Sequence, residues 1–433
     1  MRGNYINRFR WLRNLPLRRA LGVLAVGTLL MSAHQAYAAD TTYTGEFNTL
    51  LRMGKDAGKR NLYPVYEYLR LQTNTTLKDG SDVSFQFGGW GRLDLADKSS
   101  SQVTDGDVQY ALLSYQGAKN NLVINLGRQF VAEGVATELL DGLYLRQDLK
   151  AGFGAAAYVG KPVMTTVQEK TVDTVYGARL SHTMPAYYAI GASVLKSDRG
   201  SERYREEAGI DVWARPITDL DLTGRTSYNS ITSGWMEHAY ALSYAPLESL
   251  KLSVDLANIN YRHYFHNMTM SAFSLKNGII NPDENMVSVG GSVAYNLTKN
   301  LTVTADFKNY AYNIIGESNY YGGKVSYRLP DSLLAGAGFY RMDGATSRLR
   351  YNELRAYVSK MLGKTDLTAD FITLMYDKSV AGVKNSYIVT GAASHAFGKK
   401  VKVGADIEYS RTPDFDNQLR GILKLSYLFD TTP

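Results

Sequence analysis

The chain has 433 residues, of which 45% are hydrophobic and none is cysteine, with 48 basic and 41 acidic side chains. A soluble chain of this length would form two or three domains or one large one, and its formal charge of +7 suggests nucleic acid as a partner. The lack of cysteine excludes disulfide bonds, covalently attached c-type haem and cysteine metal sites. The order of residues along the chain argues against the nucleic-acid interpretation as well.

Residues 1–38 have the features of a cleavable secretory signal. They contain six arginines and no lysine or acid, followed by the apolar run Ala20 to Met31 and the small-residue site Ala36-Tyr37-Ala38. This run is shorter than the roughly 20 residues that a membrane-spanning helix needs. Cleavage would remove six of the 48 basic residues and leave a balance of +1. We therefore expect an exported protein with no nucleic-acid partner.

After residue 38 the sequence alternates apolar and polar side chains with a period of two, which is typical of β-strands. The pattern is clearest at residues 83–95, 220–229, 301–308, 401–409 and 419–429. These segments have the length needed to cross a bilayer at a tilt, and their polar faces carry charges in mid-strand, as a wet lumen permits. Tyrosines near the predicted strand ends fit interfacial girdles.

We therefore expect an all-β fold, namely a transmembrane antiparallel up-and-down β-barrel. Residues 39–433 would form this barrel as a single domain in the outer membrane of a Gram-negative bacterium, in contact with outer-membrane lipid. A soluble β-sandwich is the alternative, but its core would not accept charges in mid-strand.

The connections between the predicted strands fall into two alternating classes, as expected for short periplasmic turns and longer external loops. Tight turns are predicted near 78–81, 118–121, 150–151, 183–186, 215–219, 246–249, 296–300, 329–332, 361–364 and 397–400. Looser connections are predicted near 54–62, 96–106, 131–140, 161–172, 197–203, 230–234, 263–283, 314–318, 344–348, 378–384 and 411–416. Together they predict 22 strands, with 20 as the alternative because the strand at 43–53 and the pair around 150–151 have the weakest patterns.

A barrel of this size encloses a wide lumen. Barrels of 16–18 strands already leave an aqueous channel, and 22-stranded transporters hold a plug. No segment long enough for a plug precedes residue 43 of the mature chain. The lumen is therefore expected to be open, narrowed by folded-in loops, or filled by another protein.

At this point the chain resembles the Gram-negative outer-membrane porins. Leu126-Gly127-Arg128-Gln129 is similar to the strand end before the constriction loop of several porin families, and Asp141-Gly142-Leu143-Tyr144-Leu145 to the strand that returns from it. The resemblance implies that residues 130–141 fold inward, with an ordinary external loop as the alternative. The side chains that it implies near the narrowest point are Arg128, Glu133, Glu138, Asp141 and Arg146.

The last strand ends in Phe429, and this resembles the barrel-assembly signal of porin C-termini, although four residues follow the aromatic side chain. The charges expected to face the lumen have mixed signs. They are Arg92, Asp94, Asp211, Asp221, Arg225, Asp255, Asp306, Lys324, Arg328, Asp370, Lys402, Asp406, Arg420 and Lys424. A ladder of one sign would indicate ion selectivity, and no such ladder is visible in the sequence.

Other motifs carry little chemistry. Gly152-Phe153-Gly154 lacks the helix that a dinucleotide fingerprint needs, and no G-x-S-x-G nucleophile elbow occurs. His263 and His266 with nearby methionines could hold a soft metal, but incidental loop histidines explain them better. A barrel enzyme would need a histidine near a rim, and only position suggests His182, His238 and His395. We therefore expect no enzyme activity, no cofactor and no metal.

Two functions remain. The first is a porin-like channel for passive diffusion of small hydrophilic solutes, in which a polar lumen replaces the desolvation cost of crossing the bilayer. The second is a barrel sheath around a periplasmic or multihaem cytochrome partner, forming an electron conduit across the outer membrane. The wide barrel without a plug favours this alternative more than a 16-stranded barrel would.

Overall fold

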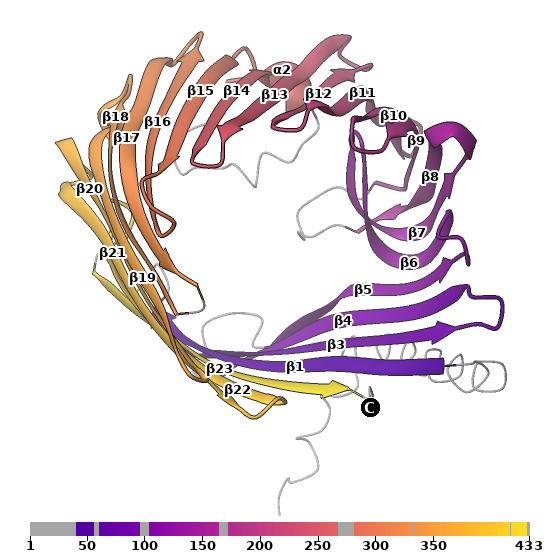
Figure 1. Cartoon of the computed structure of the whole chain (residues 1–433), viewed down its shortest axis with the longest axis horizontal. Helices are drawn as coiled ribbons and strands as arrows, with labels where there is room; N and C mark the ends of the chain where they lie inside the picture. Colours follow the sequence, from indigo (N-terminus) through magenta and orange to yellow (C-terminus); the bar gives the residue numbers. More distant parts are fainter. Residues whose placement is uncertain are drawn as a thin grey trace, which may run out of the picture.

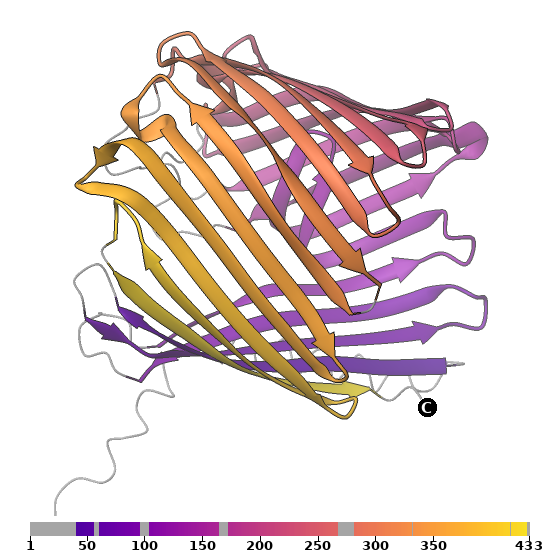
Figure 2. The ribbon, with the colours of Figure 1, turned by 60° about the vertical axis from the view of Figure 1, so that its left-hand side comes forward.

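The fold is a closed ring of long, tilted strands (Figures 1 and 2). The computed structural model describes residues 40–55, 60–95, 104–163, 172–266, 281–330, 332–415 and 417–430. Within those ranges no helix is long and apolar enough to cross a membrane. The signal predicted at residues 1–38 lies outside the described residues and stays a prediction.

The first strands are β1 (Asp40–Lys55), β2 (Asn61–Leu62), β3 (Pro64–Thr76), β4 (Asp82–Asp94), β5 (Thr104–Gln116), β6 (Leu122–Glu133), β7 (Ala136–Asp148), β8 (Phe153–Pro162), β9 (Thr174–Met184), β10 (Tyr188–Arg199), β11 (Glu202–Ile217) and β12 (Leu220–Asn229). The others are β13 (Gly234–Leu247), β14 (Leu250–Asn260), β15 (Asn285–Asn296), β16 (Leu301–Tyr312), β17 (Gly316–Leu329), β18 (Leu333–Asp343), β19 (Arg350–Leu362), β20 (Thr365–Val380), β21 (Val383–Phe397), β22 (Val401–Arg411) and β23 (Gln418–Asp430). The short helices are η2 (Lys150–Gly152), α2 (Tyr261–Tyr264) and η4 (Ser347–Leu349).

Each long strand pairs antiparallel with its neighbours in the chain, and β1 closes the ring by pairing with β23 from Thr44↔Asp430 to Met53↔Gly421. The two-residue strand β2 is followed after one residue by β3, so the two count as one wall strand. The barrel therefore has 22 strands, as the alternation predicts, and the alternative of 20 is wrong. At the seam, the ring of Phe429 lies across Gly45, where a Cβ would come within 2.0 Å of Cζ.

The predicted connections agree with the structure except in length. All ten predicted tight turns join successive strands at one end of the barrel, which we call the turn end; the opposite end is the loop end. Three loops predicted to be loose, at 131–140, 197–203 and 378–384, are instead two-residue connections. The strands run further than the sequence suggests, and a glycine with positive φ (Gly134, Gly200 or Gly382) makes each tight reversal possible.

The two faces of the wall differ in chemistry. Large apolar side chains that are exposed on the outer face include Leu126, Val293, Phe307 and Ile407, as expected for contact with lipid acyl chains. On the opposite face, polar side chains of alternate strands meet over the strand between them. Because such contacts across a strand need a concave surface, this face is the lumen.

Tyrosines occur on both faces, so the girdle accounts for only part of them. Tyr295, Tyr409 and Tyr427 are exposed on the outer face. Tyr320 and Tyr340 instead stack in the lumen with ring centroids 5.1 Å apart, and the Tyr340 hydroxyl donates a hydrogen bond to Asp306.

Candidate functional site: a hairpin folded into the lumen

The hairpin of β6 and β7 leaves the barrel wall at its loop end. β5 and β6 pair only from Ala111↔Arg128 to Gln116↔Val123, and β7 begins to pair with β8 at Leu140↔Pro162. Residues 129–138 therefore pair only within the hairpin. Figure 1 shows this part of β6 and β7 curling inside the ring toward β10 and β11.

Gly127 marks the point of departure. Its φ is +121°, and a Cβ there would lie 2.1 Å from the carbonyl oxygen of Ala111 on β5. Only glycine accommodates both the backbone conformation and the close approach of the neighbouring strand. The bend that directs the hairpin inward thus depends on one residue within the motif Leu126-Gly127-Arg128-Gln129.

The departure leaves the loop end of β5 without a strand partner on that side, and side chains cover its backbone. The carboxylates of Asp105 and Asp107 accept hydrogen bonds from the N–H groups of Gly106 and Val108. Arg128 Nη1 donates to the carbonyl oxygen of Val108 at 2.6 Å. These contacts satisfy part of an otherwise open strand edge in the barrel wall.

Arg128 is itself held by a two-point ion pair. Its Nε and Nη2 lie 2.8 and 3.0 Å from the carboxylate oxygens of Asp141 on β7. The planar guanidinium matches the geometry of a carboxylate, which makes this arrangement directional as well as attractive. Two of the predicted constriction residues therefore brace the base of the hairpin.

A small hydrophobic core fixes the hairpin to the inner wall. Its buried members come from the hairpin and from three wall strands, and they are Val131, Ala136, Leu140, Tyr158, Val175 and Leu195. The side chain of Leu140 is fully buried, and Val131 and Leu195 are 2% and 1% exposed. Burial of this kind contributes about 1.5–3 kcal/mol for each large apolar side chain.

The sequence contains a signal for this core that the alternation alone does not bring out. On three successive strands an apolar residue facing inward directly adjoins one facing outward, at Tyr158-Val159, Val175-Tyr176 and Val194-Leu195. An apolar pair means that the strand is apolar on both faces, which indicates that the inner face is covered too. Such pairs on β8, β9 and β10 mark the place where the hairpin packs.

Polar contacts position the tip of the hairpin. Gly134 has a φ of +60° at the reversal, and the N–H of Val135 donates to Ser193 Oγ on β10 at 3.0 Å. The Val135 side chain lies against Gly209 on β11, where a Cβ would come within 2.4 Å of Val135 Cγ1. A larger residue at position 209 would displace the tip.

Ion pairs join the acids of the hairpin to arginines of the wall. Arg205 on β11 lies between Glu138, at 2.5 Å, and Glu207, at 2.8 Å. Arg179 on β9 contacts Asp211 at 2.5 Å and Glu133 at 3.6 Å. Tyr144 on β7 also donates its hydroxyl to Glu133, at 2.6 Å.

The structure thus brings four of the five predicted constriction residues to the hairpin or its base. Glu133 and Glu138 lie on the hairpin, and Arg128 and Asp141 lie where it leaves the wall. Arg146 lies two residues from the turn end of β7, contacts Asp148 at 3.3 Å and lies beside Tyr144, which bonds to Glu133 of the hairpin. Sequence reasoning missed the wall residues Arg179 and Arg205, because it considered one loop without its partner surface.

The fourteen charges predicted to face the lumen alternate along their strands with the exposed apolar side chains of the outer face. Several of them form ion pairs with adjacent strands or with strands two apart. These pairs include Arg355–Asp370, Arg215–Asp221 and Arg420–Glu408 between adjacent strands, and Lys308–Asp255 and Lys402–Asp366 across one strand. Opposite charges are interleaved around the wall. Their effect on ion selectivity stays a prediction.

The histidines suggested by position lie in separate surroundings within the described ranges. His182 contacts the carbonyl oxygen of Ala151, and His238 and His395 each contact a threonine hydroxyl, on three separate strands. No three His, Cys, Asp or Glu side chains in the described part of the chain could together hold a metal ion. The methionines at 268 and 270 lie outside the described residues.

Comparisons with known proteins found distant similarity to solved structures. No protein-family model matches the chain, and no curated protein matches it. Solved structures that it is similar to include OccK5 (OpdH) of Pseudomonas aeruginosa, with 11% identity, 92% of this chain and 99% of that chain covered, and a TM-score of 0.44. OccAB1 of Acinetobacter baumannii shares 10% identity over 92% of this chain and 98% of its own, with a TM-score of 0.45.

Similarity at this level carries no conclusion about solute or mechanism, so the assignment rests on the barrel itself. A closed antiparallel ring with an apolar outer face and a polar inner face is the architecture of outer-membrane barrels. The structure confirms the predicted fold class, and its barrel fits the predicted location in a Gram-negative outer membrane.

Proposed function

We propose that the protein is a passive channel for small hydrophilic solutes, narrowed by the β6–β7 hairpin. The observation that carries this proposal is the packing of the hairpin on the inner wall through both a hydrophobic core and ion pairs. A lumen lined with charged and hydroxyl groups replaces the water that a polar solute gives up. The solute then avoids the desolvation cost of the bilayer.

The hairpin gives the channel its selectivity in this proposal. Glu133 and Glu138 are compensated by Arg179 and Arg205, so the hairpin restricts the lumen by its volume more than by net charge. Phe130 is 64% exposed and lies on the hairpin face opposite the buried Val131. Solutes passing the narrowest point would therefore meet an aromatic side chain beside the Arg128–Asp141 pair.

The alternative, a sheath around a multihaem cytochrome, gains no support from the structure or the comparisons. The hairpin occupies part of the space that such a partner would need. A passive channel also needs no catalytic group and no cofactor, so the proposal assigns none. The oligomeric state does not enter the proposal.

Conductance of the purified protein in planar bilayers tests the proposal. We expect steady, voltage-independent conductance, and liposome swelling that falls as the size of an uncharged sugar increases. A protein that inserts, shows heat-modifiable migration as a folded barrel and still conducts nothing would refute the channel. Recovery of a haem-staining partner after extraction in mild detergent would instead favour the sheath.

A further inference from the structure

At the seam that closes the barrel, strand pairing stops short of the loop end. Pairing between β1 and β23 stops at Met53↔Gly421, and the last residues of β1 pair instead with β2, as Gly54↔Leu62 and Lys55↔Asn61. β23 continues to pair with β22 as far as Ser410↔Gln418. Pairing between the two closing strands therefore ends two residues before the end of β1.

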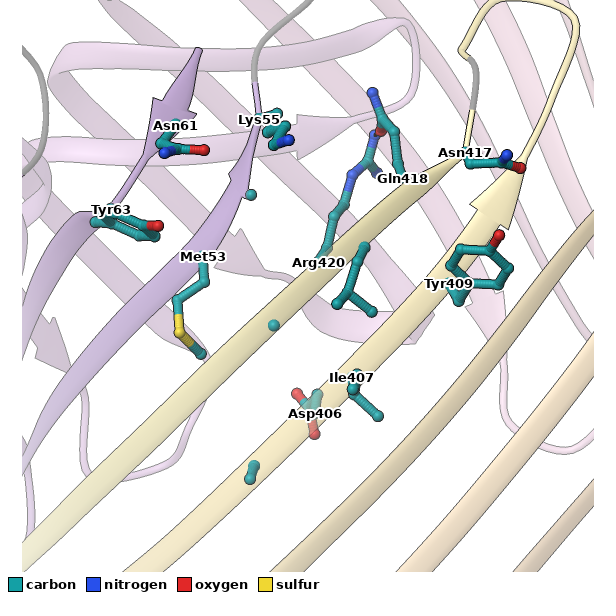
Figure 3. A pocket seen from close by; sticks show the side chains of 14 residues that line it. Met53, Lys55, Asn61, Tyr63, Asp406, Ile407, Tyr409, Asn417, Gln418 and Arg420 are labelled. Carbon is teal, nitrogen blue, oxygen red and sulfur yellow. Dashed lines mark hydrogen bonds between the residues drawn. The ribbon is translucent and has the colours of Figure 1, made fainter. Parts of the chain in front are cut away.

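A cavity of about 670 Å³ lies on the outer face at this separation (Figure 3). Its walls are mainly apolar and include Met53, Tyr63, Ile407, Tyr409 and Leu419. Gly421 opposes Ile407 in the register of β22 and β23, and its lack of a side chain deepens the hollow. The cavity has the size and apolar lining of a ligand pocket and faces the lipid.

A second cavity, of about 550 Å³, lies behind it on the lumen side. Its lining is mixed, and its polar side chains include Tyr66, Thr368, Thr390 and Glu408. Both cavities share part of their lining, including Gly54, Lys55, Arg420 and Gly421. Figure 3 shows Lys55 and Arg420 on the two strands that border the separation. The two hollows therefore lie on either side of the same stretch of wall.

Flexible side chains fill the wall between the two cavities. A Cβ at Gly421 would lie 2.9 Å from the terminal Cε of Met53, and a Cβ at Gly54 would lie 3.7 Å from Arg420 Cγ. No strand crosses the gap between these residues in the described part of the seam. Met53 and Arg420 are long and unbranched, so rotation of their side chains changes the width without movement of the backbone.

We propose that the stretch of wall between the two cavities is a passage, namely a lateral portal that binds a single-chain amphiphile. Its hydrocarbon chain would lie in the outer cavity among Met53, Ile407 and Leu419, where apolar contact replaces lipid contact. Its head group would reach the polar inner cavity. The cationic side chains there are Arg52, Lys55, Arg92 and Arg420, and the anionic ones are Asp94, Asp406 and Glu408. This near balance of charge fits a zwitterionic head.

Photolabelling with lysophosphatidylcholine tests the portal. The protein is reconstituted in phospholipid vesicles and irradiated with one of two probes, carrying a diazirine either at the end of the acyl chain or in the head group. We expect the chain probe to label peptides that contain Met53 or Leu419, and the head probe to label peptides that contain Tyr66 or Thr390. Labelling by the head probe confined to outer-face residues would overturn the proposal.

Variants that fill the passage provide the second half of the test. Gly54→Trp should reduce lumenal labelling by the head probe about tenfold, the loss expected when roughly two methylene groups lose their contacts. If Gly54→Trp does not fold, Gly421→Leu takes its place. It should reduce lumenal labelling by the head probe in the same way, from the outer side of the wall. The matched control is Gly291→Leu, a glycine of β15 with its nearest neighbour atom 3.8 Å from an added Cβ.

Folding of each variant is checked by heat-modifiable migration. Equal lumenal labelling in Gly54→Trp, Gly421→Leu and Gly291→Leu would contradict the portal. This readout does not depend on conductance, so it can succeed or fail separately from the proposed channel.

Discussion

Replacement of Leu140 by alanine should release the hairpin without opening the barrel. Leu140 is fully buried in the core between the hairpin and the inner wall, and its backbone is the first of β7 to pair with β8. The shorter side chain leaves the backbone pairing of the wall intact and removes contacts between the hairpin and wall residues such as Gly160. The change therefore acts on the docking equilibrium of the hairpin.

The size of the effect follows from burial. A fully buried leucine that becomes alanine costs about 2–5 kcal/mol, depending on how far the surroundings collapse. A loss of about 3 kcal/mol would raise the undocked fraction of hairpins roughly a hundredfold. The ion pairs of Arg205 and the hydrogen bond from Val135 to Ser193 remain, so docked and undocked states should both be observed.

Single-channel recording in planar bilayers measures this equilibrium. We expect the unmodified protein to hold one conductance level, and Leu140→Ala to switch between that level and a larger one. Leu256→Ala, on the outer face of β14, is the control and should behave as the unmodified protein does. A folded Leu140→Ala protein with the same single level as the control would refute the docked hairpin as the constriction.

Two further substitutions probe the wall. Gly45→Leu places a side chain where the ring of Phe429 lies, and this overpacking should cost about 1–3 kcal/mol at the closing seam. It should lower the temperature at which the folded band is lost on a gel; an unchanged temperature would be inconsistent with close packing at the seam. Arg128→Ala removes the pair with Asp141 and the bond to the Val108 carbonyl, at a cost of about 2 kcal/mol. Hydrogen exchange should then increase at the loop end of β5, and unchanged protection there would show that Arg128 does not cover this edge.

The alternation of side chains predicts most of the barrel, because each strand contacts lipid on one face and water on the other. This physical requirement repeats at every strand, so the ten tight turns and the strand number follow from the sequence. It also predicts which charges share a face, as for Asp255 and Lys308, although it cannot say that they pair two strands apart.

The features that depend on register do not follow from alternation. A strand that leaves its neighbour keeps its pattern, so the alternation in residues 111–128 does not indicate that pairing of β5 with β6 ends at Arg128. Only the porin-like motif Leu126-Gly127-Arg128-Gln129 suggests a strand end there. The same holds for the seam beyond Met53. The docking of the hairpin is an intermediate case, because the adjacent apolar residues Val194-Leu195 show that the inner face is covered but not which segment covers it.

Thiol labelling along β6 tests the account most directly, since the chain has no cysteine of its own. Leu126 is 56% exposed on the lipid face, Phe130 is 64% exposed on one face of the hairpin, and Val131 is buried between the opposite face and the wall. We predict that a membrane-impermeant maleimide labels Phe130→Cys in vesicles and leaves Leu126→Cys and Val131→Cys unlabelled. Equal labelling of Phe130→Cys and Val131→Cys would contradict a hairpin docked in a water-filled lumen.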